Sequence, residues 1–314
     1  MEVDESAPKL AEKCAESRLT NIVSIGPDVY VRAITNLGGR TAPIACSSTA
    51  EVTSRRAPNI MQKLLEAIAA KRDRLDRLRP LSPEALGNLE HYYDLEITYS
   101  SNAIEGNTLT PVETTLVIEQ GITIAGKPLR DHLEALDHYD ALRWVRELAR
   151  EKTPVTESDI RNLHRLVLQR SRPDIAGQYA NMARYVRTET GRHEFPPPVE
   201  IPSLIGDFSA WLRVSPDTPE TAFTSHRRLV DVHPFNDGNG RAARLLMNLI
   251  LIRGGYPPVA VRLEDRLAYI LALQQAQAGQ GTEDFDTLLY ERLDATLGEY
   301  LKAFERKQFP GQPR

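Results

Sequence analysis

One stretch of the sequence, residues 233–244, reads HPFNDGNGRAAR and joins a tight turn to a strongly apolar segment. The turn contains Gly238, Asn239 and Gly240, which are residue types that tolerate a positive φ. The segment that follows, from Arg241 to Ile252, has the apolar spacing of a buried helix. A turn of this kind directs several backbone N–H groups at one place, at the positive end of the helix dipole. The stretch therefore predicts a nest for an anion.

Two arginines, Arg241 and Arg244, stand in the expected first turn of that helix. Cations there oppose the helix dipole at a cost of about 0.3–1 kcal/mol each, and at a spacing of three residues they also repel each other. The arrangement becomes favourable when a polyanion binds, because guanidinium groups form paired hydrogen bonds with phosphate. Asp237 supplies oxygen ligands suited to Mg²⁺, and His233 can exchange a proton near neutral pH. Together these residue types predict an enzyme that transfers a phosphoryl group of a nucleotide.

The rest of the chain predicts an almost all-α fold. Apolar residues recur at helical spacing from about residue 59 onward, and capping signals such as Thr110-Pro111-Val112-Glu113 mark where helices begin. Residues 184–198 read RYVRTETGRHEFPPP and instead predict a short β-hairpin followed by an extended strip. Because strands and helices do not alternate, a doubly wound nucleotide-binding fold is not expected.

Composition narrows the class of protein. The 314 residues include 39 Lys and Arg and 43 Asp and Glu, which gives a net charge of −4 and no reason to expect nucleic acid as a partner. The two cysteines, Cys14 and Cys46, form neither a disulfide framework nor a CxxC pair, so a reducing, cytoplasmic location is expected. No apolar run is long enough for a transmembrane helix, and the N-terminus lacks a secretion signal, so no membrane association is expected.

Residues 233–244 resemble the signature of the Fic (filamentation induced by cAMP) domain, HPFx[DE]GNGRxxR, and match it at every defining position. The resemblance implies an all-α Fic-type core with a small β-hairpin flap. It also implies a protein adenylyltransferase, which transfers AMP from ATP to a Ser, Thr or Tyr hydroxyl of a target protein with the help of Mg²⁺. His233 would be the base, Asp237 would hold Mg²⁺ through the nucleotide phosphates, and Phe235 would anchor the loop in the core. The phosphates would be bound by Gly238, Asn239, Gly240, Arg241 and Arg244.

A second stretch, residues 101–106, reads SNAIEG and resembles the inhibitory helix motif [ST]xxxE[GN] of the same family. Ser101 and Glu105 are four residues apart and so share one face of a helix. By this resemblance, Glu105 would pair with Arg244 and deprive the γ-phosphate of its partner, while Gly106 would end the motif. The protein is therefore expected to inhibit itself.

Further site residues follow only from the resemblance. Residues 184–198 would be the flap on which an extended target segment docks by strand addition, and Arg187, Thr188 and Glu189 would lie near the nucleotide. Tyr269 and Gln277 would border the adenine. One departure from the family is that Gly177-Gln178-Tyr179 is followed by Ala180, where many members have arginine; an arginine comes later, at Arg184.

The expected organisation is a weakly ordered N-terminal segment (1–58), a helical region with the inhibitory helix (59–150), the Fic catalytic core (151–305) and a tail (306–314). Family members often dimerise, so a homodimer is an open expectation. Two alternative functions keep the fold. The enzyme could use another nucleotide donor, or it could remove AMP with Glu105 positioning a water molecule. A third alternative, of another class, is a catalytically silent interaction module, although the intact motif argues against it.

Overall fold

The computed structural model describes residues 21–24, 30–33, 49–151, 153–188 and 191–308. Contacts divide the chain into two units, Met1–Ser54 and Arg55–Arg314. The first unit contains an antiparallel hairpin of β1 (Asn21–Ser24) and β2 (Tyr30–Ala33). The expectation that residues 1–58 are weakly ordered falls mostly outside the described residues. It differs from the structure at its end, because a helix begins at Thr49 rather than near residue 59.

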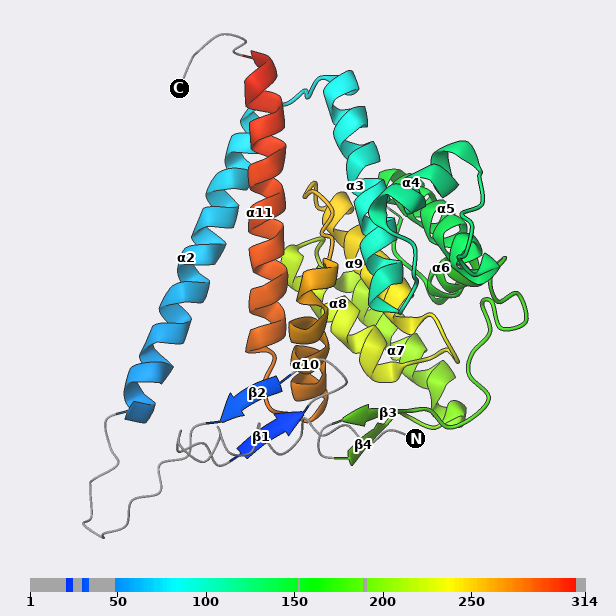
Figure 1. The fold of residues 1–314 in the computed structure, drawn as a ribbon. Coiled ribbons are helices and arrows are strands. Elements are labelled where there is room, and N and C mark those ends of the chain that lie inside the picture. Colours follow the sequence, from blue (N-terminus) through cyan, green and yellow to red (C-terminus); the bar gives the residue numbers. More distant parts are fainter. Residues whose placement is uncertain (1–20, 25–29, 34–48, 152, 189–190, 309–314) are drawn as a thin grey trace, which may run out of the picture. The chain divides into compact units, whose positions relative to one another are not determined.

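The second unit is built almost entirely of helices, as the sequence predicts (Figure 1). Its helices are α2 (Thr49–Arg77), of which this unit contains the part from Arg55 onward, α3 (Pro83–Ile104), α4 (Pro111–Gln120), α5 (Leu129–Glu151), α6 (Glu157–Leu168), α7 (Ile201–Val214), α8 (Pro219–Val232), α9 (Asn239–Arg253), α10 (Arg266–Gln277) and α11 (Glu283–Gln308). Two short 3₁₀ turns, Pro198–Glu200 and Leu263–Asp265, precede α7 and α10.

The helix starts follow local sequence chemistry. Thr110 accepts a hydrogen bond from the backbone of Glu113, whose carboxylate accepts one in return, which forms the predicted capping box at α4. Thr156 and Asp159 form an equivalent box at α6. Ser82 caps α3, and the proline after it occupies the first helical position, where a missing N–H costs nothing.

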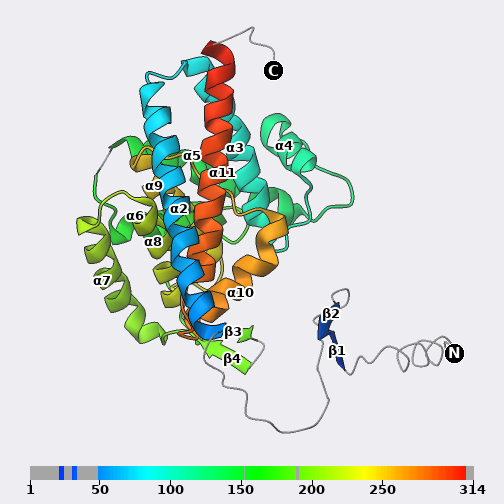
Figure 2. The same ribbon diagram turned by 90° about the vertical axis from the view of Figure 1, so that its left-hand side faces the viewer.

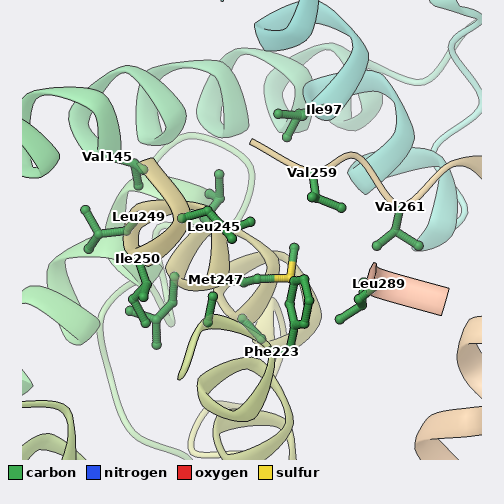
Figure 3. Packing of buried hydrophobic residues seen from close by; sticks show 14 of the residues in the cluster. Ile97, Val145, Phe223, Leu245, Met247, Leu249, Ile250, Val259, Val261 and Leu289 are labelled. Atoms are coloured by element: carbon green, nitrogen blue, oxygen red, sulfur yellow. The ribbon is translucent and has the colours of Figure 1, made fainter. Parts of the chain in front are cut away.

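Helix α9 lies at the centre of the core. Every residue from Arg241 to Leu251 is buried, and the helix packs against α8, α5, α6 and α3. Figure 3 shows the apolar side chains of α9 meeting those of the surrounding helices, among them Ile97, Val145, Phe223, Leu245, Met247, Leu249, Ile250 and Leu289. Because α9 is surrounded on all sides, its N-terminus is held rigidly, and residues 233–244 lie at that end.

Helices α2 and α11 run side by side (Figures 1 and 2). Two ion pairs join them, from Lys71 Nζ to Asp294 Oδ2 at 2.7 Å and from Arg74 Nε to Glu305 Oε1 at 2.6 Å. None of the helices in the described part of the chain is long and apolar enough to cross a membrane.

The predicted hairpin consists of β3 (Tyr185–Thr188) and β4 (Gly191–Glu194), which pair antiparallel with Val186 opposite His193. Phe195 N donates to Arg184 O at 3.1 Å and extends the pairing by one step beyond the strands. We refer to β3, β4 and the turn between them as the flap. Arg184, the arginine that comes after the departure from the family pattern at Ala180, donates to Pro196 O at 2.6 Å and so ties the base of the flap together.

Candidate active site

His233 caps the C-terminus of α8 in the left-handed conformation, with φ 47° and ψ 56°. It is the one non-glycine residue with a positive φ in the described ranges. Its ring Nδ1 lies 3.3 Å from Val230 O, and because a carbonyl only accepts, Nδ1 carries the proton and Nε2 keeps a free lone pair. The ring of Phe195 stacks on the imidazole at 3.8 Å with 14° between the planes. Burial lowers the pKa of His233 to about 4, although the hydrogen bond to Val230 opposes the shift.

The loop after His233 is fastened to the core by its own residues. Phe235 is fully buried, as the sequence predicts. The side-chain amide of Asn239 closes the loop, because it accepts from Phe235 N at 3.0 Å and donates to Phe235 O at 2.8 Å. The side chain of Asn239 is therefore committed to the loop, and only its backbone N–H remains for an anion.

His164 on α6 is a supporting residue that the sequence analysis did not identify. Its ring stacks on Phe235 at 3.6 Å and 2°, its Nε2 lies 2.9 Å from Asp237 O, and its Nδ1 accepts from Gly177 N at 3.0 Å. Burial lowers its pKa to about 4, so the ring is neutral and bonds on both sides. The available sequence signal was weak, since a histidine on the apolar face of a helix with Ile160 and Leu163 resembles an ordinary core position.

The start of helix α9 has the backbone conformation that an anion-binding nest needs. Gly238 precedes it with φ 76°, and a Cβ at this position would lie 3.3 Å from both His164 Nε2 and Leu168 Cδ1. Only glycine combines that conformation with that close approach. The first turn of the helix leaves backbone N–H groups without intrahelical partners at the positive end of the dipole.

Arg244 is buried and makes four contacts. Its Nε donates to Ser101 Oγ at 2.9 Å, and its Nη2 donates to Ser101 O at 2.9 Å and to Glu105 Oε1 at 2.7 Å. Its Nη1 lies 3.4 Å from the Tyr269 hydroxyl. Burial alone would lower the pKa of Arg244, but Tyr269 and Glu105 raise it, so the guanidinium keeps its charge. One prediction was wrong, because Arg244 is the sixth residue of α9 and lies outside its first turn, where the dipole penalty applies.

Glu105 lies at the C-terminal end of α3, where Gly106 follows with φ 96°. Its side chain is 40% exposed and reaches over Gly240. A Cβ on Gly240 would stand only 2.5 Å from Glu105 Oε1, so the glycine provides the space for the carboxylate. The structure therefore brings the two sequence motifs together at one ion pair.

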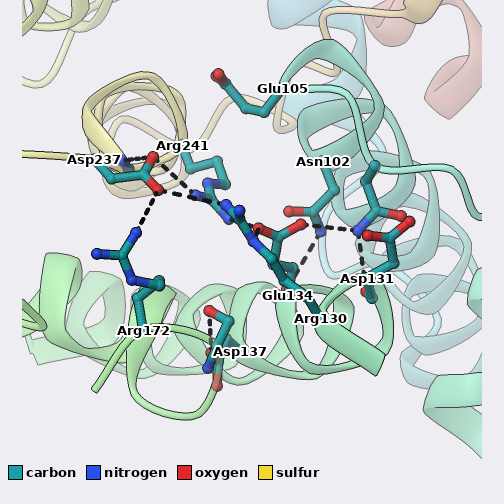
Figure 4. A network of polar contacts seen from close by, with 12 residues as sticks. Asn102, Glu105, Arg130, Asp131, Glu134, Asp137, Arg172, Asp237 and Arg241 are labelled. Atoms are coloured by element: carbon teal, nitrogen blue, oxygen red, sulfur yellow. Dashed lines mark hydrogen bonds and ion pairs between the residues drawn. The ribbon is translucent and has the colours of Figure 1, made fainter. Parts of the chain in front are cut away.

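Arg241 faces a different set of partners from Arg244. It is 1% exposed and lies between Glu134 Oε1 and Asp237 Oδ1, each 3.4 Å from one of its terminal nitrogens (Figure 4). Glu134, on α5, also accepts hydrogen bonds from Asn107 at 3.1 Å and from Arg130 Nε at 2.8 Å. Sequence patterns could not identify Glu134, because it is one of several acidic residues on an amphipathic helix.

Asp237 is the carboxylate that remains partly open, with 34% of its side chain exposed. Its Oδ1 accepts from Gly238 N at 2.6 Å, and its Oδ2 lies 3.5 Å from Arg130 Nη2 and 3.9 Å from Arg172 Nη1 (Figure 4). Within the described ranges, no three His, Cys, Asp or Glu side chains are grouped to hold a metal. A divalent cation at Asp237 would therefore need further oxygen ligands, which nucleotide phosphates supply.

A cavity of about 320 Å³ opens beside His233 and Arg244. Its walls come from α3, the flap and α8 to α10, and the lining residues are Glu105, Val186, Arg187, Phe195, Val230, His233, Gly240, Arg244, Tyr269, Ile270, Leu273, Gln274 and Gln277. Of the predicted flap and adenine residues, Arg187, Tyr269 and Gln277 line it. Thr188 lines a neighbouring hollow instead, and Glu189 lies outside the described residues.

Helix α10 contributes wall residues that the sequence analysis missed. These are Ile270, Leu273 and Gln274, which with the predicted Gln277 follow the i, i+3, i+4, i+7 spacing of one helical face, a pattern that could have identified them. Gln274 Nε2 also donates to Arg187 O at 3.2 Å and joins α10 to the flap. Tyr269 is buried beneath them, with its hydroxyl 2.7 Å from His226 Nε2, so His226 supports the tyrosine from α8.

The chain is similar to proteins of a known family. Residues 154–251 match the Fic/DOC family. The protein adenylyltransferase Fic of Nematostella vectensis is 38% identical over 76% of this chain and 56% of its own length, and fic-1 of Caenorhabditis elegans is 32% identical over 88% and 54%. The chain thus spans about half the length of the curated relatives it matches.

Solved structures agree with this match. A Fic-domain protein from Bacteroides thetaiotaomicron superposes with a TM-score of 0.71 and 30% identity, over 79% of this chain and all of that chain. Fic-1 from C. elegans superposes with a TM-score of 0.70 and 30% identity, over 83% and 80%.

Proposed function

This chain belongs to the Fic/DOC family, and we propose that it is a protein adenylyltransferase which transfers AMP from ATP to a protein hydroxyl and is inhibited by its own Glu105. The observation that carries the proposal is the 2.7 Å pair between Glu105 and Arg244 at the edge of a cavity that His233 also lines. Curated relatives that match most of this chain are named protein adenylyltransferases.

His233 acts as the general base. A Ser, Thr or Tyr hydroxyl loses its proton to Nε2 while its oxygen attacks the α-phosphorus of ATP. The bond between the α- and β-phosphates breaks, and pyrophosphate leaves. The neutral, Nδ1-protonated ring supports this role, because it offers a lone pair on the nitrogen that makes no hydrogen bond to Val230.

The start of α9 binds the phosphates. Backbone N–H groups of Gly238, Asn239 and Gly240 stabilise the developing negative charge, Arg241 adds a fixed positive charge, and Arg244 binds the γ-phosphate. Asp237 would hold Mg²⁺ together with the bound nucleotide, and the cation would supply positive charge to the leaving group. The partial exposure of Asp237 beside the nest supports this assignment.

Glu105 inhibits by binding Arg244, the residue that would otherwise bind the γ-phosphate. The carboxylate offsets the positive charge of the guanidinium and places negative charge where the phosphate would bind. ATP then lacks the contact that orients its α-phosphate toward His233. The resting protein is therefore nearly inactive.

The target protein docks on the flap as an extended strand. Among the described strands, β3 and β4 pair only with each other, so an outer edge of the flap is available for strand addition. Arg187 and Gln277 border the nucleotide from the flap and from α10, and their position in the cavity lining supports this. The homodimer and the reducing location remain predictions.

Labelled ATP tests the reaction and the inhibition together. The full chain is incubated with cell lysate and with ATP labelled on either the α- or the γ-phosphate. Glu105→Gly is expected to raise protein labelling from α-labelled ATP by about tenfold or more, because releasing about 1.4 kcal/mol changes an equilibrium tenfold. γ-Labelled ATP should give no such signal.

Two matched variants complete the experiment. Adding His233→Ala to Glu105→Gly is expected to abolish labelling while ATP binding persists. Glu105→Gln, which keeps the shape and loses the charge, should fall between wild type and Glu105→Gly. Equal labelling in wild type and Glu105→Gly, with ATP bound in both, would disprove the inhibition.

A further inference from the structure

The ring of His233 is held from two sides. On one side Nδ1 bonds to Val230 O within the last turn of α8, and on the other the ring of Phe195 stacks on it at 3.8 Å and 14°. The backbone of His233 is in the left-handed region, which a non-glycine residue occupies only when its surroundings hold it there. The orientation of the imidazole therefore depends on its neighbours rather than on its own torsional preference.

Phe195 directly adjoins the flap and is not part of a helix. It follows β4 directly, and its backbone N–H closes the hairpin on Arg184 O at 3.1 Å. Arg184 also donates to Pro196 O, so the chain on both sides of Phe195 is bonded to the same arginine. The position of the Phe195 ring is therefore set by closure of the hairpin.

We propose that Phe195 is a positioning residue for His233, through which the orientation of the base depends on a closed flap. The proposal rests on the proposed role of His233 as the general base. A target strand added to the flap would stabilise the hairpin and with it the stacked ring. Substrate docking and alignment of the base are then linked by one aromatic contact.

The stacked ring also keeps water from the imidazole. The charged and titratable groups that face His233 are Arg184 at the base of the flap, Glu105 at the end of α3 and His193 on β4. Burial has the largest effect on the pKa of His233, which it lowers to about 4; Arg184 and His193 lower it further, and Glu105 raises it. Removing the ring without changing these groups should let the pKa rise toward its ordinary value of about 6.5.

The first test is kinetic and uses the full chain with Glu105→Gly as the parent. Initial rates of self-labelling are measured against ATP concentration for Phe195→Leu, Phe195→Tyr and Phe208→Leu. Phe208, a buried aromatic on α7, serves as the control for a general loss of packing. Phe195→Leu should lower kcat by about tenfold to a hundredfold with KM for ATP changed less than about twofold, since small misplacements of a catalytic group have effects of this size. Phe195→Tyr, which keeps the ring, should restore most of kcat.

The second test needs no catalysis. An NMR titration follows the His233 ring, identified among the seven histidines by its loss in His233→Gln. Phe195→Leu should raise the pKa of His233 by about one unit or more, and the acid limb of the kcat/KM profile should move up with it. An unchanged pKa, with kcat no lower than in Phe208→Leu, overturns the proposal. If the parent transfers no AMP, the proposed function fails, but the titration still decides whether Phe195 controls the ring.

Discussion

Arg241 and Arg244 are three residues apart on α9, yet they lie in separate electrostatic environments. Arg241 is balanced by Glu134 and Asp237, and Arg244 is balanced by Glu105. The mutual repulsion expected from their spacing is therefore offset by carboxylates from α5, the motif loop and α3. His138, buried beside both, has a pKa well below its usual value, first through burial and then through the two arginines, so it adds no third positive charge.

Tyr269 gives a prediction at the scale of one hydroxyl group. The hydroxyl donates to His226 Nε2 and accepts from Arg244 Nη1, and the residue is buried. Tyr269→Phe should lower the free energy of unfolding by about 1–3 kcal/mol, because it leaves buried polar groups without partners. The preference for ATP over GTP should stay the same, since the hydroxyl points to Arg244 and His226.

Urea unfolding and nucleotide competition measure these two effects. Tyr290→Phe is the control, because Tyr290 packs edge-on against Phe223 on another part of the core. A changed nucleotide preference in Tyr269→Phe, with stability intact, would make Tyr269 an adenine contact instead.

Helix α3 is fixed at the end that carries Glu105. Arg266 Nε on α10 donates to Ile104 O at 2.8 Å, just before Glu105. Just after it, Asn107 bonds to Glu134, and Thr108 N donates to Asp131 Oδ2 at 2.8 Å. The backbone around Glu105 is thus tied to α10 on one side and to α5 on the other, and rotation of the side chain is the simplest way to release Arg244.

Removing one tie should weaken the inhibition. Arg266→Ala is expected to raise self-labelling of the otherwise wild-type chain by up to about tenfold, because a hydrogen bond from a charged group contributes about 1.5–3 kcal/mol. In the Glu105→Gly background the same substitution should have no such effect. Labelling with α-labelled ATP gives both numbers, and Arg292→Ala, which unpairs Asp265 just before α10, is the control. An equal rise in both backgrounds would show that Arg266 acts on the site directly.

Across the whole molecule, features that depend on neighbouring residues could be predicted from the sequence better than contacts between distant segments. Helix starts such as Thr110 and Thr156 were predictable because a cap needs only residues within one turn. The chemistry of residues 233–244 was predictable because the base, the acidic residue and the two arginines all lie in this one stretch of sequence. His164, Glu134 and Phe195 were not, because each meets the motif only after distant segments pack together. The partner of Arg244 was named in advance only through family resemblance.

The fold also buries four histidines around the site in neutral form, and this gives a prediction for the whole molecule. Burial lowers the pKa to about 4 for His164 and His233 and to about 3 for His226, and it lowers the pKa of His138 well below the ordinary value of 6.5. A histidine with a lowered folded-state pKa contributes stability that is present above pH 6.5 and is lost as the pH falls toward the folded value. Each should cost about 2 kcal/mol between pH 7 and pH 5.

Urea unfolding at pH 7 and pH 5 measures that loss directly. His226→Gln removes one titrating group from the core, so the difference between the two pH values should shrink by about 2 kcal/mol in this variant. Phe208→Leu, which removes buried packing but no titratable group, should leave the difference unchanged and serves as the control. A wild-type chain equally stable at both pH values would mean that the buried rings take up protons within the fold, and the neutral base assigned to His233 would then be wrong as well.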